Sequence, residues 1–130
     1  MTCLLDTHVW LWLVVAPERL SAKAAGLLTD MNTRLLLSAV TSWEIAIKYS
    51  LGRLELPQPP AIYVPDRMRR TGVEGLPISH AHTLRVASLG DHHKDPFDRL
   101  LVAQAQEESV PILTADPIFA RYGVQVLPAV

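Results

Sequence analysis

The sequence predicts an α/β fold with a central parallel β-sheet flanked by α-helices on both faces. Short apolar runs alternate along the chain with stretches of helical periodicity, which is the pattern of strands joined by helical crossovers. The run from Leu35 to Leu37 does not alternate with polar residues, as expected of a parallel strand covered on both faces. With 130 residues and 49% hydrophobic content, the chain is long enough to bury a core as one domain spanning residues 1–130.

Five apolar runs are the expected strands. They cover residues 2–5, 34–39, 73–78, 110–114 and 124–127. Helical segments separate them, so we expect parallel strands whose carboxyl ends share one edge of the sheet. Ligands of such sheets bind outside that edge.

Start and stop signals locate the helices between these strands. The expected helices cover residues 7–16, 21–31, 41–51, 66–71 and 79–89, a segment from residue 96 and a short last helix from residue 117. Ser21 and Ser79 are N-caps, and Thr41 with Glu44 matches a capping box that puts Glu44 in the first turn of its helix. The prolines between residues 57 and 65 indicate a loop.

The helix that starts at Pro96 has the clearest start signals. Asp95 occupies the N-cap position, and Pro96 takes the first helical position, where its missing N–H costs nothing. Asp98 falls in the first turn, where the helix dipole favours an anion. Starting the helix is by itself a sufficient explanation for either carboxylate taken alone.

Composition limits the possible roles. The net charge of -1 provides no global positive field for nucleic acid, so such a role needs a local patch or a metal. Cys3 is the only cysteine, which excludes an internal disulfide, and we expect it in the core. The apolar stretch at 11–16 is far shorter than the roughly 20 residues of a membrane span, and no basic segment precedes it as in a signal peptide. We therefore expect a cytoplasmic protein.

The histidines do not form a metal-binding pattern. His80 and His82 stand two apart, whereas metal ligands on one helix face stand three or four apart, so we interpret them as surface or capping residues. His92 and His93 precede Asp95 in a loop. Substrate contact is conceivable there, although solvated loop histidines are commoner.

Four acids are candidates for a site at the carboxyl edge of the sheet. Asp6, Glu44 and Asp116 follow predicted strands, and Asp98 starts a helix that can run beside them. Each acid also suits a helix start, but Ser or Thr would serve that purpose without gathering like charges. A divalent cation would relieve the repulsion between them.

An all-oxygen ligand set favours Mg²⁺ or Mn²⁺, and such sites perform phosphoryl chemistry. Hydrolysis of a phosphodiester is therefore the leading reaction. Two alternatives remain open: a phosphoacceptor switch domain with an acidic pocket, and a catalytically silent protein-binding module.

An ordered set of short motifs resembles the PIN-domain ribonucleases, in particular the VapC-type toxins of bacterial toxin–antitoxin pairs. The motifs are Leu5-Asp6-Thr7-His8, Ser42-Trp43-Glu44-Ile45-Ala46-Ile47-Lys48, Asp95-Pro96-Phe97-Asp98-Arg99 and Thr114-Ala115-Asp116. The resemblance runs from Leu4 to about Tyr122, and Gly90 stands where many members have proline.

This resemblance implies a PIN-like fold and puts the acidic quartet of the family at Asp6, Glu44, Asp98 and Asp116. It implies a Mg²⁺- or Mn²⁺-dependent endoribonuclease acting on tRNA, rRNA or mRNA and inhibited by a cognate antitoxin. It also implies a homodimer that can form a larger complex with that antitoxin.

Further residues are candidates for contacts to the ligands or the substrate. They are Thr7, Thr114, Asp95, Lys48 and Arg99. The two threonines can bond a ligand carboxylate, whereas Asp95 fits the N-cap better. Lys48 and Arg99 can hold phosphate, with ion pairing to the nearby acids as the alternative. Arg67, Arg69 and Arg70 form the densest basic cluster, either an RNA track or a solvated helix face.

Overall fold

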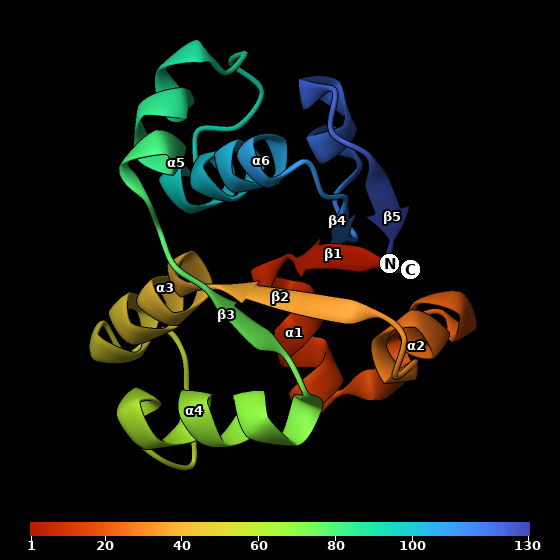
Figure 1. Cartoon of the computed structure of the whole chain (residues 1–130). Coiled ribbons are helices and arrows are strands. Elements are labelled where there is room, and N and C mark those ends of the chain that lie inside the picture. The colour runs from red at the N-terminus through yellow and green to blue at the C-terminus, as the bar shows by residue number, and fades with distance from the viewer.

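The computed structural model describes all 130 residues and contains one five-stranded sheet (Figure 1). Its strands are β1 (Thr2–Leu5), β2 (Arg34–Ser38), β3 (Glu74–Leu76), β4 (Ile112–Thr114) and β5 (Val126–Pro128). The order across the sheet is β3-β2-β1-β4-β5, and every neighbouring pair is parallel. The predicted parallel sheet is confirmed, and each strand overlaps its expected range.

Helices cover both faces of the sheet. They are α1 (Thr7–Val15), α2 (Ala22–Thr29), α3 (Ala39–Ser50), α4 (Pro60–Thr71), α5 (His80–Arg85) and α6 (Pro96–Glu108), with short 3-10 helices η1 (Pro17–Arg19), η2 (Val86–Ser88) and η3 (Pro117–Tyr122). Helices α1, α2 and α4 lie on one side of the sheet, and α5 and α6 lie on the other (Figure 1). No helix is long and apolar enough to cross a bilayer.

Alternate strand residues enter two separate cores. Cys3 and Leu5 of β1 pack with Trp10 of α1 in one core, whereas Leu4 packs with Leu101 of α6 in the other. Because adjacent residues of a strand point to opposite faces, the apolar runs of β1 and β2 fill both cores. Cys3 is fully buried, as expected.

The start of α3 differs from the predicted capping box. The helix begins directly after β2, because the Ser38 hydroxyl accepts a hydrogen bond from the Val40 N–H at 2.9 Å. Thr41 is already inside the helix, and its hydroxyl lies 2.9 Å from that of Thr7. Glu44 therefore lies in the second turn, and the prediction that it serves the helix start is wrong.

Helix α4 also differs from its expected range. It begins at Pro60 rather than near Asp66 and contains Pro65 in its interior. Pro60 suits the start of a helix, while Pro65 removes one backbone donor. Burial of Tyr63 and Val64 in the first core compensates for that lost hydrogen bond.

We expect Ser38→Ala to lower the free energy of unfolding by about 1 to 2 kcal/mol, because it removes a buried N-cap. Ser42→Ala is the matched control within the same helix and is expected to be nearly neutral. Urea denaturation of both variants measures the difference. A larger loss for Ser42→Ala would contradict the observed helix start.

Candidate active site

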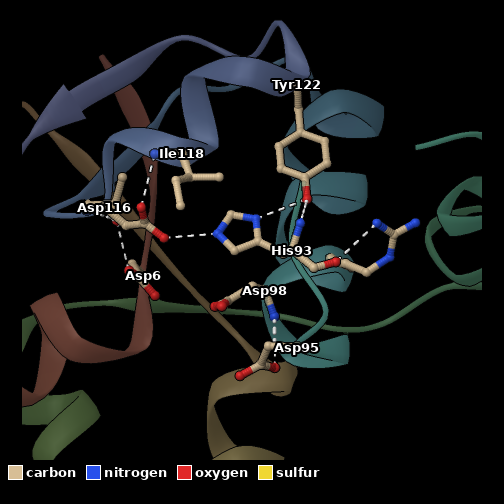
Figure 2. Close-up of polar contacts among 9 residues, drawn as sticks. Asp6, His93, Asp95, Asp98, Asp116, Ile118 and Tyr122 are labelled. Atoms are coloured by element: carbon tan, nitrogen blue, oxygen red, sulfur yellow. Dashed lines mark hydrogen bonds and ion pairs between the residues drawn. The ribbon is translucent and has the colours of Figure 1, made fainter. Parts of the chain in front are cut away.

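Asp6 and Asp98 face one another at the carboxyl edge of the sheet. Asp6 follows the last residue of β1, and Asp98 lies in the first turn of α6. Figure 2 shows their carboxylates pointing toward each other, although the two residues come from distant parts of the chain. The sheet edge and the start of α6 thus bring together two of the four predicted acids.

Asp6 is a buried carboxylate with no role in capping. Its side chain is 5% exposed and makes no capping hydrogen bond to α1. The Thr114 hydroxyl donates to Asp6 Oδ2 at 2.8 Å, which is the carboxylate contact expected of Thr114. Burial raises the pKa of Asp6, the bond from Thr114 opposes this rise, and the nearby Glu44 charge adds to it.

Asp98 is free of capping because Asp95 performs that task. Asp95 Oδ1 accepts from the Phe97 N–H at 2.8 Å and from the Asp98 N–H at 3.4 Å, which confirms Asp95 as the N-cap. Burial raises the pKa of Asp98 to about 7, and the charges of Asp95, Asp6 and Glu44 add to this effect. A half-buried carboxylate is thus held among other acids.

Glu44, in the second turn of α3, lies near enough for its charge to raise the pKa of Asp6 and of Asp98. It is 4% exposed, and its carboxylate forms an ion pair with Lys48, four residues further along the helix. Lys48 is thus paired with an acid. Ion pairing was the expected alternative to phosphate binding for this residue.

Asp116 is held by two donors on the far side of the site. Its Oδ1 accepts from the Ile118 N–H at 2.9 Å, so it does cap η3. Its Oδ2 lies 2.8 Å from His93 Nε2 (Figure 2). Burial pushes the pKa of Asp116 up, but the hydrogen bonds from His93 and Ile118 outweigh this and lower it below its ordinary value.

Two other candidates have structural partners instead of a substrate-facing position. The Thr7 hydroxyl bonds that of Thr41 and not a carboxylate. The Arg99 guanidinium donates to the carbonyls of Gly90, His93 and Val86, at 2.9, 3.4 and 3.4 Å. Arg99 therefore connects the loop that precedes α6 to that helix, and its hydrogen bond to the Gly90 carbonyl is part of this connection.

The basic cluster of α4 lies away from the acids. Arg67, Arg69 and Arg70 all pair with Asp66. Arg69 and Arg70 also line a cavity with Thr33, which precedes β2 at the amino edge of the sheet. The structure thus separates this cluster from the carboxyl edge and does not support an RNA track leading to the acids.

Sequence reasoning missed the roles of His93 and Tyr122. The His93 side chain is 8% exposed, so its interpretation as a solvated loop residue is wrong. Its Nδ1 and its backbone N lie 2.9 and 2.7 Å from the Tyr122 hydroxyl. The only available signal for His93 was its place two residues before Asp95, and Tyr122 carried none.

The acids fit a divalent cation in charge and donor type. No three His, Cys, Asp or Glu side chains stand in metal-binding geometry, because Glu44 is turned to Lys48 and Asp116 to His93. Mg²⁺, however, is often held by one or two carboxylates together with waters and substrate phosphate. The Asp6 charge raises the pKa of Asp98, so these two carboxylates are the pair that a cation would stabilise most directly.

The chain is similar to known proteins over most of its length. Residues 3–125 match the PIN domain family. Ribonuclease VapC22 of Mycobacterium tuberculosis is 30% identical over 115 residues, which cover 88% of this chain and 87% of VapC22. Ribonuclease VapC16 of the same organism is 51% identical over 69 residues, and this match spans only about half of either protein, 50% of this chain and 49% of VapC16.

Solved structures show the same fold at low sequence identity. VapBC2 from Rickettsia felis, bound to a DNA fragment from its promoter, superposes with a TM-score of 0.76 at 16% identity, covering 100% of both chains. VapBC-1 from nontypeable Haemophilus influenzae gives a TM-score of 0.66 at 18% identity, covering 98% of each chain. The family match and the VapC22 relationship together show that this chain belongs to the PIN-domain family, among its VapC-type members.

Proposed function

We propose that this protein is the toxin of a toxin–antitoxin pair and acts as a Mg²⁺- or Mn²⁺-dependent endoribonuclease. The observation that carries this proposal is the opposed pair of buried Asp6 and half-buried Asp98, which lie among further acids at the carboxyl edge of the sheet. The names of the VapC relatives support ribonuclease chemistry. Its substrate is cellular tRNA, rRNA or mRNA, which places the activity in the cytoplasm.

The proposed chemistry assigns distinct tasks to the residues. When bound, Mg²⁺ or Mn²⁺ supplies an activated water and neutralises charge on the phosphate. Asp6 and Asp98 hold the ion, with Glu44 and Asp116 as the outer members of the proposed quartet. Thr114 fixes the orientation of Asp6 through its hydroxyl.

The alternatives make different demands on the site. A phosphoacceptor domain uses one carboxylate that accepts a phosphoryl group, so a phosphate-trapping assay with acetyl phosphate separates it from a nuclease. A catalytically silent binding module should show no stabilisation by a metal and no cleavage of RNA. The high pKa of Asp98 favours a cation-binding site over a silent binding module, because keeping this acid ionised at neutral pH is costly unless a cation binds.

We propose that the antitoxin binds an apolar groove beside α1. A groove of about 320 Å³ is lined by Leu11, Trp12 and Val15 of α1 together with Leu56 and Tyr63. Solved relatives support such a partner, since one of them is a toxin–antitoxin complex from Klebsiella pneumoniae. The homodimer expected from the family is part of the same proposal.

Asp6→Asn should reduce RNA cleavage by about a hundredfold or more, because the change removes a charged ligand from the reacting centre. Growth arrest on expression should disappear with it. Asp30→Asn, an exposed acid after α2, is the matched control and should retain full activity. Equal cleavage of total RNA by both variants at equal soluble level would contradict the proposed site.

Asp98→Asn should raise the metal-free melting temperature, and more so at pH 8 than at pH 5. Because the folded pKa of about 7 exceeds the unfolded value near 4, ionised Asp98 destabilises the fold increasingly as pH rises between these values. Added Mn²⁺ should stabilise the wild type more than the variant. Thermal melts in EDTA and in Mn²⁺ measure both effects, and a destabilised variant with an unresponsive wild type would contradict the prediction.

Val15→Asp should leave RNA cleavage intact but weaken inhibition by the antitoxin, because Val15 is 69% exposed and lines the apolar groove. Leu84→Asp, at a 74% exposed position on α5, is the control. Cleavage assays with increasing antitoxin compare the two. Equal inhibition of both variants would place the antitoxin elsewhere.

A further inference from the structure

We propose that His93 is the positioning residue for Asp116, and that Tyr122 fixes the imidazole tautomer that allows it to do so. This inference rests on the proposed function, since it gives His93 a task only if Asp116 helps to hold a divalent cation. The observation behind it is a continuous hydrogen-bonded chain from Tyr122 through His93 to Asp116 (Figure 2).

One arrangement of a neutral imidazole satisfies every donor and acceptor in this chain. The Tyr122 oxygen accepts the backbone N–H of His93 at 2.7 Å, so its own proton can be donated to His93 Nδ1 at 2.9 Å. With Nδ1 as the acceptor, the ring proton lies on Nε2 and is donated to Asp116 Oδ2 at 2.8 Å. A neutral ring thus holds the carboxylate while Asp116 keeps its full negative charge.

Aromatic packing keeps the His93 ring in place. The rings of His93 and Tyr122 are nearly parallel, 3° apart with centroids at 5.4 Å. Phe119 of η3 contacts the imidazole from another direction, with centroids at 4.8 Å. The side chain is only 8% exposed, so it has little freedom to leave Asp116.

The backbone of His93 is fixed as well. Its N–H is bound by Tyr122, and its carbonyl accepts a hydrogen bond from Arg99 of α6 at 3.4 Å. The same guanidinium holds Gly90 at 2.9 Å. The imidazole is therefore positioned from α6 and from η3, the helix that Asp116 caps.

Hydrogen bonds through Thr114 also connect Asp116 to Asp6. The Asp116 N–H donates to the Thr114 hydroxyl at 3.0 Å, and that hydroxyl donates to Asp6 Oδ2 at 2.8 Å. His93 thus fixes the side chain of Asp116, while the Thr114 hydroxyl links the backbone N–H of Asp116 to the Asp6 carboxylate. Each Asp116 oxygen accepts one protein hydrogen bond and retains lone-pair capacity for a cation or its water.

Three variants test this role, with Mn²⁺ as the probe and RNA absent. His93→Ala removes the donor and should weaken Mn²⁺ binding by about 10- to 100-fold, as changes in residues that orient metal ligands commonly do. His93→Gln retains an N–H at a similar reach and should recover much of that loss. Tyr122→Phe keeps the ring but frees Nδ1, so ¹⁵N spectra of the imidazole should lose the single Nε2–H tautomer of the wild type.

The neighbouring His92 provides the matched control. Its ring packs edge-on against Tyr122 at 4.8 Å and contacts no acid, so His92→Ala should bind Mn²⁺ like the wild type. Titrations followed by electron paramagnetic resonance give the affinities, and circular dichroism checks folding. At saturating Mn²⁺, His93→Ala should regain RNA cleavage, whereas a role in RNA binding would leave the deficit.

The outcomes separate the two proposals. If folded His93→Ala binds Mn²⁺ as tightly as the wild type, the positioning role is overturned and the proposed function stands. If the wild type neither binds Mn²⁺ nor cleaves RNA, the proposed function fails and the positioning role fails with it. Weakened binding in His93→Ala, recovery in His93→Gln and an unchanged His92→Ala support the inference.

Discussion

The parallel pairing of β1 with β4 is the constraint on which the site depends. β1 lies in the centre of the sheet, and the Asp6 N–H bonds the Leu113 carbonyl at 3.0 Å. This pairing brings the Thr114 hydroxyl onto the Asp6 carboxylate, although the two residues are 108 positions apart. The central strand therefore carries a carboxylate whose orientation is set by its neighbour, and the other acids are arranged around it.

The residues that cap helices α3 and α6 differ from the proposed metal ligands, so these acids are not needed to cap either helix. Ser38 and Asp95 satisfy the first N–H groups of α3 and α6, so neither Glu44 nor Asp98 is needed there. A carboxylate spared from capping lacks the hydrogen bonds that would stabilise its charge. Burial and the neighbouring acids therefore raise the pKa of Asp98 with no hydrogen bond to its carboxylate to oppose them, which makes the site receptive to a cation.

The fold could be predicted largely from the sequence because its signals are local. The unbroken apolar runs define strands covered on both faces, and Asp95 with Pro96 marks the start of α6. The start of α3 was missed because Ser38 belongs to the strand pattern and to the cap at once, while Thr41 matched a capping box by coincidence. The first part of helix α4 was missed because its prolines suggested a loop. Pro60 suits the helix start, and burial of Tyr63 and Val64 offsets the cost of Pro65.

The site was less predictable, because its side-chain partners are set by tertiary contacts. The sequence identifies three acids after predicted strands and a fourth at a helix start. It does not show that Glu44 pairs with Lys48 or that Asp116 bonds His93. Nor could Arg99 be recognised as the residue that ties the loop in place, since its partners are backbone carbonyls.

These contacts also explain how a metal-free fold tolerates so many acids. Lys48 neutralises Glu44 and two hydrogen bonds stabilise Asp116. Asp6, with one side-chain hydrogen bond from Thr114, and Asp98, with none to its carboxylate, are the less stabilised members. The uncompensated charge is thus confined to the two carboxylates that face each other, and it is there that binding of a cation would restore the most stability.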